Sequence, residues 1–453
     1  MKRIVRHFVD GFRSTAQKRD REGRRIGAEL KFPLVNANGE AARREAVAAL
    51  WASLEGLGWE PVVDELTRKI VGAKKAGSQN DTVASCETGY CKTEFSLAHV
   101  ADLLELSDDV TELCETLRAF SDREGVYFLG YGIQPKTPPS KRLLIRKGRT
   151  AFWGKVFRSN HVIAPQDGDD VHLFTVNASS QVHVDVTEEE AIHAVNVFNG
   201  LAGAQIALTA DSSVWQGRVD PDFKCVCEMF WDWWMPDGKR VGIPTHPFQD
   251  MTDYVHTIAR LRPIYVKRNG EPIGVMDYKT FAEYCQAGER AQGVDARGRT
   301  VPLTPCADDI DQHGTFYWYN ARISRYYTLE NRVNDQQPPG QLLCVPALTL
   351  GILEALAEAK EAIASYVWED LAAARVAACR EGLSAVAGDV AVGKLAERML
   401  EVAQLGLERR GLGEERFLEP LWHRLKERRC PADAAAEVFD EGGIEALVDA
   451  RRL

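Results

Sequence analysis

The sequence has 453 residues and a formal net charge of −10. At about 150 residues per domain, this length allows two or three units, and one large sheet-based domain with helical additions is equally compatible. The acidic balance argues against a nucleic-acid binder, which normally carries a basic surface. It leaves room for a nucleotide substrate, because a phosphate site needs only a few local cations.

The chain shows no pattern typical of a membrane or secretory protein. It has no stretch of about 18 apolar residues, and the basic segment 1–25 lacks the apolar core of a secretory signal. We expect this segment to form a helix followed by a solvated connection. The ten cysteines are scattered without a zinc-ligand spacing, so we expect reduced thiols and a cytoplasmic location.

Helical periodicity recurs along the first two-thirds of the chain. Residues 41–58 form an amphipathic pattern that ends at glycines. Thr187 and Glu190 match a capping box, which predicts the start of a long helix that runs through Ala210. The same periodicity predicts further helices over residues 108–124, 250–262 and 279–287.

Segments in which apolar and polar residues alternate lie between these helices and predict strands. In each of them the apolar side chains share one face and the polar side chains share the other. The predicted strands are Ile26–Val35, 126–135, Val171–Val186 and Arg322–Asn334.

The composition changes at about Pro346. The rest of the chain is rich in Ala, Leu, Glu and Arg, which predicts helices. We therefore divide the chain into a catalytic domain, residues 1–345, and a helical C-terminal region, residues 346–453. Two polar segments before this boundary are expected to form a surface loop (336–340) and a polar insertion (288–300).

The polar faces of the predicted strands carry an unusual set of side chains. A sheet face that meets water is the simpler interpretation, but it would carry mostly Lys, Thr and Ser. Magnesium takes oxygen ligands and arginine pairs with phosphate, so this set predicts a site for ATP and Mg²⁺. It consists of Glu29, Glu94, Gln181, His183, Asp185, Glu330 and Arg332, with Glu87 brought near Glu94 by a turn at Thr88-Gly89.

The common glycine-rich nucleotide motifs are absent from the sequence. It contains no G-x-x-x-x-G-K-[ST] and no G-x-G-x-x-G after a predicted strand. A nucleotide enzyme of this sequence must therefore hold phosphates with metal ions and cationic side chains.

Several segments match, in order, the motifs of one known family. They are RIGAELKFPLV (25–35), FLGYGIQPK (128–136) with RKGR (146–149), SQVHVDV (180–186), ARISRYYTLENRVND (321–335) and LLCVPALTLGIL (342–353). The chain resembles, over roughly residues 25–355, the glutamate–cysteine ligases of the plant and proteobacterial type.

The resemblance implies an α+β fold, with a twisted antiparallel sheet like that of the glutamine synthetase catalytic domain and helices packed outside it. It implies that ATP phosphorylates a substrate carboxylate and that an amine then displaces the phosphate. The enzyme supplies positioning and charge stabilisation for these steps. The implied partners are small amino-acid or peptide substrates, for a monomer or homodimer that binds neither nucleic acid nor membrane.

The resemblance also implies roles for individual residues. A half-buried sheet histidine with a hydroxyl partner is the alternative for His183, and a plain loop cation is the alternative for Arg149. The implied metal ligands are Glu29, Glu87, Glu94, His183 and Glu330, the implied catalytic residues are Arg332 and Lys31, and the implied contacts to ATP or substrate are Arg146, Arg149, Gln181, Arg322 and Arg325.

The sequence departs from the family at three places. The second acidic segment, CETGYCKTEF (86–95), is one residue longer than the family motif and carries Lys92 among the acids. Lys31 stands where the family has a second glutamate, so a metal ligand is replaced by a positive charge. Cys227, four residues before Trp231, stands where the family has a substrate-binding arginine, and Lys224 is the candidate to replace it. Three interpretations stay open: synthesis of γ-glutamylcysteine, the same chemistry on another amino acid, amine or peptide, and an inactive homologue that binds a nucleotide or a partner.

Overall fold

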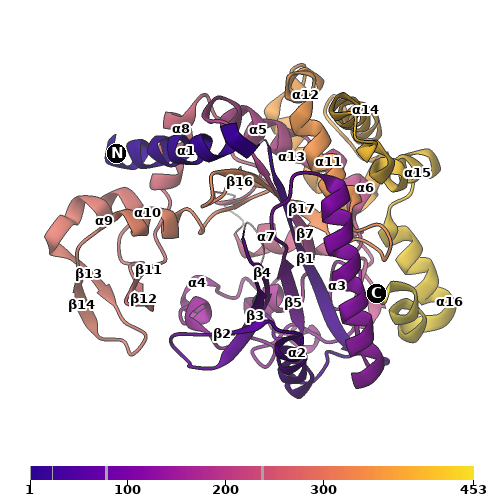
Figure 1. Cartoon of the computed structure of the whole chain (residues 1–453), viewed down its shortest axis with the longest axis horizontal. Coiled ribbons are helices and arrows are strands. Elements are labelled where there is room, and N and C mark those ends of the chain that lie inside the picture. The colour runs from indigo at the N-terminus through magenta and orange to yellow at the C-terminus, as the bar shows by residue number, and fades with distance from the viewer. Residues whose placement is uncertain (1, 23, 77–79, 236–238) are drawn as a thin grey trace.

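A large antiparallel sheet runs through the middle of the molecule (Figure 1). The computed structural model describes residues 2–22, 24–76, 80–235 and 239–453. In this part of the chain the strand order is β16-β17-β7-β1-β5-β4-β3-β2, and β6 pairs with the end of β1. The strands are β1 (Ile26–Asn36), β2 (Glu60–Val63), β3 (Ile70–Lys75), β4 (Thr82–Cys86), β5 (Lys92–Ser96), β6 (Val126–Phe128), β7 (Ser179–Asp185), β16 (Ala321–Ile323) and β17 (Thr328–Asp335).

The central strand β1 shows how the sequence forms this sheet. Leu30 and Phe32 are fully buried on one face, whereas Glu29 keeps 24% of its side chain exposed on the other. On the buried face the Phe32 ring packs against Phe95 of β5, with the ring centroids 6.1 Å apart. The predicted α+β fold, with an antiparallel sheet and flanking helices, is confirmed.

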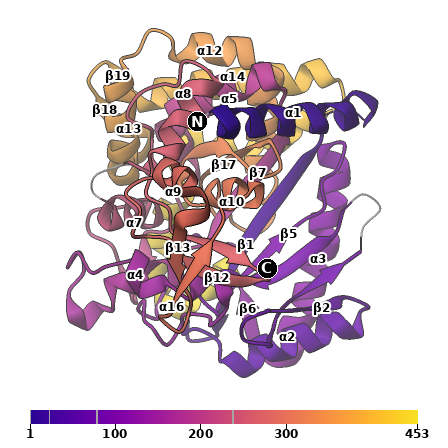
Figure 2. The ribbon, with the colours of Figure 1, turned by 90° about the vertical axis from the view of Figure 1, so that its left-hand side faces the viewer.

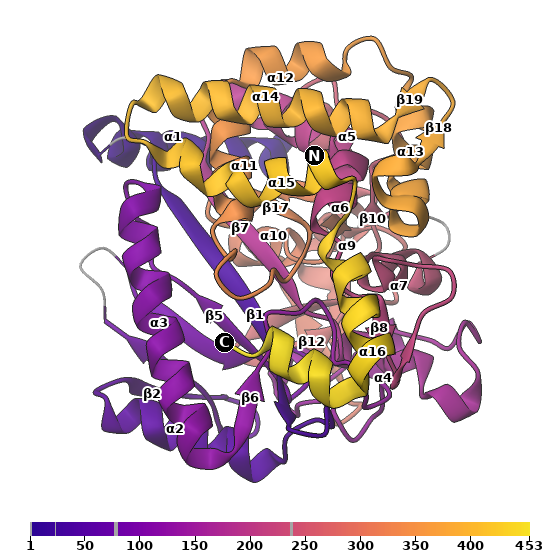
Figure 3. The same ribbon diagram turned by 90° about the vertical axis from the view of Figure 1, so that its right-hand side faces the viewer.

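Helices cover one face of this sheet (Figure 3). Contacts join α6 to β17 and α11 to β7 and β1. Helices α11 and α14 approach so closely that a Cβ atom at Gly406 would lie only 1.9 Å from the carbonyl oxygen of Gly351. Glycine, which has no Cβ atom, allows this approach. The helices on this side are α3 (Leu103–Glu124), α5 (Glu188–Gly200), α6 (Ala202–Thr209), α11 (Cys344–Glu354), α14 (Val392–Arg410), α15 (Glu419–Glu427) and α16 (Pro431–Arg451).

A smaller sheet and short helices lie in front of the opposite face (Figure 2). The small sheet has the strand order β11-β12-β13-β14. Strand β13 is part of segment 288–300, for which the sequence indicated only a polar insertion. The elements on this side are α4 (Trp153–Val156), α9 (Phe281–Ala287), α10 (Ala307–His313), β11 (Tyr265–Arg268), β12 (Glu271–Gly274), β13 (Ala291–Val294) and β14 (Thr300–Leu303).

The N-terminal segment forms the helix that the sequence predicts. Helix α1 (Lys2–Glu22) packs against α8 (Met251–Ala259) and α10. Ile4, Phe8 and Phe12 recur at a spacing of four residues and are buried in this contact. The start of the chain therefore belongs to the core of the fold.

Four predicted elements differ clearly in their extent. Of the predicted strand 126–135, only Val126–Phe128 forms a strand, β6, and the rest is irregular. The capping box at Thr187 and Glu190 is present, but the helix that it opens is divided at Leu201 into α5 and α6. The first half of the predicted strand 171–186 forms a 3-10 helix, Asp170–Thr175. The predicted strand 322–334 is divided by a hairpin turn, in which Tyr327 has a φ of 60°.

The prediction of a surface loop at 336–340 is wrong at its first three residues, of which Pro338 is buried together with the two glutamines. Gln336 and Gln337 are fully buried. Their amide groups donate to the backbone: Gln336 to the Lys31 carbonyl at 3.0 Å, and Gln337 to the Thr209 carbonyl at 3.0 Å. These bonds replace the water that the polar sequence suggested.

The remaining elements complete the layers. All ten cysteines are free thiols, as expected. In the described part of the chain no single helix is long and apolar enough to cross a membrane, although the bent pair α5 and α6 passes that test when taken together. The division at residue 345 stays a prediction. The other elements are α2 (Arg44–Gly56), α7 (Val226–Trp234), α12 (Leu356–Ile363), α13 (Trp368–Glu381), β8 (Val214–Trp215), β9 (Arg218–Val219), β10 (Val241–Gly242), β15 (Trp318–Tyr319), β18 (Val386–Ala387) and β19 (Val390–Ala391).

Candidate active site

The register of the large sheet brings the predicted polar side chains together. Glu29 on β1 lies opposite Gln181 on β7. In the same way, His183 on β7 lies opposite Glu330 on β17. Residues that are directly opposite in an antiparallel pair share a face, so three strands present these groups to the side of the small sheet.

Lys31 is the centre of a cluster of carboxylates. Its side chain is 3% exposed, and its Nζ atom lies 3.2 Å from Glu94 Oε2 and 3.4 Å from Glu29 Oε2. Burial alone would raise the pKa of Glu29, but Lys31 and His183 outweigh it and hold that pKa at about 2. For Glu94 burial dominates over the attraction of Lys31, so its pKa is raised.

Glu87 forms a second ion-paired group beside this cluster. Its Oε2 atom lies 2.7 Å from Nζ of the buried Lys92, and its Oε1 atom lies 3.2 Å from Nη2 of Arg149. Burial would raise the pKa of Glu87, but Lys92, Lys31 and Arg149 hold it well below its usual value. Lys92 also donates to the Phe174 carbonyl at 3.1 Å, which fixes it in place.

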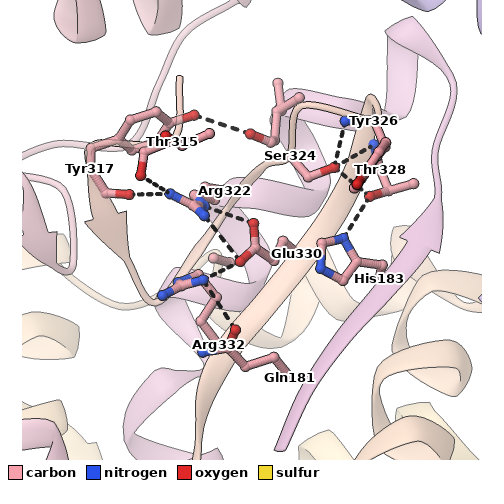
Figure 4. A network of polar contacts seen from close by, with 12 residues as sticks. Gln181, His183, Thr315, Tyr317, Arg322, Ser324, Tyr326, Thr328, Glu330 and Arg332 are labelled. Carbon is pink, nitrogen blue, oxygen red and sulfur yellow. Dashed lines mark hydrogen bonds and ion pairs between the residues drawn. The ribbon is translucent and has the colours of Figure 1, made fainter. Parts of the chain in front are cut away.

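Glu330 holds two arginines on the other side of the site (Figure 4). Its carboxylate accepts from Arg322 Nε at 2.7 Å and Nη2 at 3.2 Å, and also from Arg332 Nη1. Arg332 Nη1 donates in addition to Gln181 Oε1 at 3.2 Å. Burial would raise the pKa of Glu330, but the two arginines hold it well below its usual value. Glu330 therefore stays negatively charged at neutral pH.

His183 keeps one ring nitrogen uncommitted. Its Nδ1 atom lies 3.1 Å from the Thr328 hydroxyl, a hydroxyl partner of the kind that the simpler interpretation expected. Its buried Nε2 atom lies 3.3 Å from Glu29 Oε1 but makes no hydrogen bond. Within the described ranges, no group of three or more His, Cys, Asp or Glu side chains is arranged to hold a metal ion.

Two of the predicted arginines lie outside this arrangement. Arg325 is exposed in the β16–β17 turn, with its guanidinium 4.7 Å from the ring centroid of Tyr326. Arg146 is exposed and lines neither of the cavities described next. Their roles as contacts to ATP or substrate stay predictions. Lys224 forms an ion pair of 2.5 Å with Asp433 and also lines neither cavity, so it does not take the place of the missing arginine.

An open cavity of about 710 Å³, here called the aromatic cavity, lies between the polar sheet face and the small sheet. Lys31, Glu87, Arg149, Gln181 and Arg332 line it from the side of the ionic clusters. The opposite wall was not predicted, because its members come from separate helices, loops and strands whose approach no sequence spacing indicates. It consists of Phe152, Trp153, Val156, Phe157, Phe174, Trp231, Ile264, Tyr265, Phe316 and Trp318.

A second space of about 390 Å³, here called the polar cavity, adjoins it. The two cavities share Gln181, Trp231 and Arg332 among other residues. This cavity was not predicted from the sequence either, although Asp335 is the last residue of the segment 321–335 that resembles a family motif. Its own lining consists of Ala178, Cys227, Glu228, Tyr319, Asn320, Val333, Asn334 and Asp335.

Comparison with known proteins identifies the family. Residues 25–450 match the glutamate-cysteine ligase family 2, GCS2. The chain belongs to this family. A chloroplastic glutamate–cysteine ligase A of Oryza sativa subsp. indica is 26% identical over 395 residues, which cover 85% of this chain and 74% of the relative. The chloroplastic glutamate–cysteine ligase of Medicago truncatula is 25% identical over 441 residues, which cover 94% of this chain and 80% of the relative.

A solved structure shows the same fold. The glutamate–cysteine ligase of Francisella tularensis in complex with AMP superposes with a TM-score of 0.54 at 10% sequence identity, over 94% of this chain and 87% of that one. The predicted family is confirmed, and so is the prediction of an ATP-dependent ligase. The GCS2 protein described here places its ion-paired clusters and its two cavities on one face of the shared sheet.

Proposed function

We propose that this GCS2 protein joins the side-chain carboxylate of glutamate to the amino group of cysteine, with ATP as the phosphoryl donor and an acyl phosphate as the intermediate. The observation that carries the proposal is the family match over residues 25–450. The two plant relatives are named as glutamate–cysteine ligases. The clustered cations on the sheet face support the same chemistry.

The proposed chemistry needs positive charge at the site of phosphoryl transfer, because negative charge spreads over the phosphoryl oxygens. Lys31 and Arg332 line the aromatic cavity from the sheet, and we assign them to this role. Glu330 and Gln181 fix the guanidinium of Arg332, so no reorganisation is needed when the charge develops. Arg322 acts through Glu330 as a positioning residue.

The candidate position for Mg²⁺ is beside Glu29 and His183. Because Glu29 also forms an ion pair with Lys31, a metal ion bound there would take most of its ligands from ATP phosphate and water. Glu29 offers a partly exposed carboxylate, and the buried Nε2 atom of His183 faces it without a hydrogen bond. Bound there with ATP phosphate oxygens, Mg²⁺ would neutralise phosphate charge. Glu87, Glu94 and Glu330 are paired with lysines and arginines, so their role as metal ligands stays a prediction.

A second candidate function is the same chemistry with a larger amine. The aromatic cavity supports it, because ten apolar or aromatic side chains form one wall. The side chain of cysteine is small and needs little of that surface, whereas a flat or bulky amine would bury more of it. The replacement of the family's arginine by Cys227 also favours a substrate that differs from those of the plant enzymes.

The experiment that tests both functions is an ADP-release assay with Mg²⁺-ATP. Glutamate is offered first with cysteine and then with a panel of aliphatic and aromatic amines. The product is identified by mass, because amide formation removes one water from the sum of acid and amine. Release with cysteine supports the first function, and faster release with a larger amine supports the second. If no pair releases ADP, both are wrong and an inactive binding homologue is favoured.

The location, the substrate class and the oligomeric state predicted from the sequence are also part of this proposal. Ten free thiols support a reducing compartment such as the cytoplasm. A small amino-acid substrate follows from the family match. We further propose a monomer or homodimer without a nucleic-acid or membrane partner, which size-exclusion chromatography with light scattering tests for the oligomeric state.

A further inference from the structure

The polar cavity is poorly suited to an anionic group. Of the described residues that line it, Arg332 is the only cation, and Glu330 already engages it. Cys227 stands at the family's arginine position, and its thiol donates to the Gly132 carbonyl at 3.0 Å. The substrate carboxylate that the family's arginine would hold therefore finds no counterpart here.

Asn320 gives the cavity an unsatisfied acceptor. Its side chain is 2% exposed, its Nδ2 atom donates to Glu228 Oε1, and its Oδ1 atom has no hydrogen-bond partner. The orientation of this amide is determined by Glu228, because the same Oε1 atom accepts from Arg375 Nε at 2.9 Å and Nη2 at 2.7 Å. A buried acceptor without a donor carries the full cost of its desolvation.

Asp335 gives the cavity a carboxylate without a cation. It is 3% exposed and accepts from the backbone N–H of Asp211 at 2.8 Å and from the Ser212 hydroxyl at 2.7 Å. Both donors are neutral, and among the described residues no lysine or arginine forms an ion pair with it. A buried carboxylate of this kind favours a cationic partner.

We propose that the polar cavity binds the primary ammonium group of the amino-acid substrate through Asn320 and Asp335. An ammonium has three donors and no acceptor, which complements one unsatisfied amide oxygen and one unpaired carboxylate. The inference rests on the proposed function, since it takes the substrate to be an amino acid. It adds which end of the substrate enters this cavity, and the side-chain carboxylate is then directed to the shared boundary at Gln181 and Arg332.

The test compares L-glutamate with glutarate, which lacks only the amino group. Each acid is titrated calorimetrically into the full chain with Mg²⁺ and a non-hydrolysable ATP analogue. The wild-type protein should bind glutamate at least about tenfold more tightly than glutarate, since charge-assisted hydrogen bonds are among the stronger ones. Asn320→Ala and Asp335→Asn should each lose most of that preference while the affinity for glutarate stays the same.

Asn331→Ala is the matched control. Asn331 lies on β17 and is fully buried, and its Oδ1 atom, like that of Asn320, has no hydrogen-bond partner. It lines neither cavity. Its variant should keep the preference for glutamate, and thermal unfolding of all three variants identifies any that fails to fold. If Asp335→Asn fails to fold, the comparison of Asn320→Ala with the control still decides the question.

Three results would overturn the inference. The first is a wild-type protein that binds glutamate and glutarate equally, or binds neither acid. The second is an unchanged preference for glutamate in both test variants, and the third is an equal loss of that preference in the Asn331→Ala control. The polar cavity would then hold only water. The ADP-release assay is a separate readout. If the protein prefers glutamate but releases no ADP, the ligase function is wrong and the ammonium site stands. If it releases ADP but shows no preference for glutamate, the ligase function stands and the ammonium site is wrong.

Discussion

Lys31 on β1 lies directly opposite Glu94 on β5, with its Nζ atom 3.2 Å from Glu94 Oε2. Burial would lower the pKa of this lysine, but Glu94, Glu87 and Glu29 outweigh burial and raise it. The ammonium therefore stays charged in a nearly dry environment and balances carboxylates on both sides. A cation is thereby built into the sheet at the position for which the resemblance to the family motif predicts a glutamate.

Removing this charge should destabilise the fold. In Lys31→Met the carboxylates of Glu29 and Glu94 lose their shared partner, and breaking a buried ion pair typically costs about 3–5 kcal/mol. The free energy of unfolding in urea measures the loss. Lys74→Met is the control, because Lys74 is 42% exposed and pairs with Glu60 at the surface, where an ion pair contributes little to stability. Equal losses for both variants would contradict the assignment.

Glu330→Gln should abolish turnover in a protein that still folds, although the loss of a buried ion pair lowers its stability. The neutral amide keeps the size of the side chain but cannot balance Arg322 and Arg332, so Arg332 loses its fixed position at the cavity. ADP release measures turnover, and circular dichroism checks the fold. Glu358→Gln is the control because Glu358 makes a similar arginine pair at the surface, with Arg409. Wild-type activity in Glu330→Gln would show that the role given to Glu330 is wrong.

The sequence predicts the sheet side of the site well and its other side poorly. Alternation in β1 and β7 places Glu29, Lys31, Gln181 and His183 on one face, because the strand period of two is a local property. The partners of each charge are not local. Nothing in the spacing indicates that Lys31 is close to Glu94, and the aromatic wall is assembled from distant segments such as the one around Phe316.

Stability should depend on pH through Asp335. Burial raises the pKa of this carboxyl to about 7 in the folded protein, whereas an unfolded aspartate titrates near 3.9. Between these values the folded state binds more protons, so stability falls as the pH rises. Asp335→Asn removes this effect, and the variant should gain on the wild type by up to about 1.4 kcal/mol per pH unit.

Urea unfolding of both proteins at several pH values between 4 and 7.5 measures that difference. Asp211, whose pKa burial raises to about 6, lies beside Asp335 and raises the pKa of that carboxyl, so the measured difference includes the interaction between the two groups. A constant difference in unfolding free energy across the range would show that Asp335 does not titrate there.

Trp231 should contribute to the choice of amine. It lines both cavities, and its ring stacks on that of Trp318 with the centroids 5.5 Å apart. Trp231→Ala removes one of the largest apolar surfaces of the aromatic wall, so the KM for the preferred amine should rise about tenfold or more while the KM for ATP changes little. Trp233→Ala, on the same helix but outside both cavities, should leave the KM for the amine unchanged, and an equal rise would contradict a specific role.

The contact between α11 and α14 should not tolerate a methyl group. A Cβ atom at Gly406 would lie 1.9 Å from the carbonyl oxygen of Gly351 and 2.8 Å from its carbonyl carbon. These are backbone atoms, so the two helices must separate, and overpacking of this kind costs about 1–3 kcal/mol. Gly406→Ala should therefore lower the unfolding midpoint in urea. Gly56→Ala, at the end of α2 with open space around it, should be neutral or slightly stabilising because alanine favours helix. Equal effects of the two substitutions would show that the helices have room to accommodate a side chain.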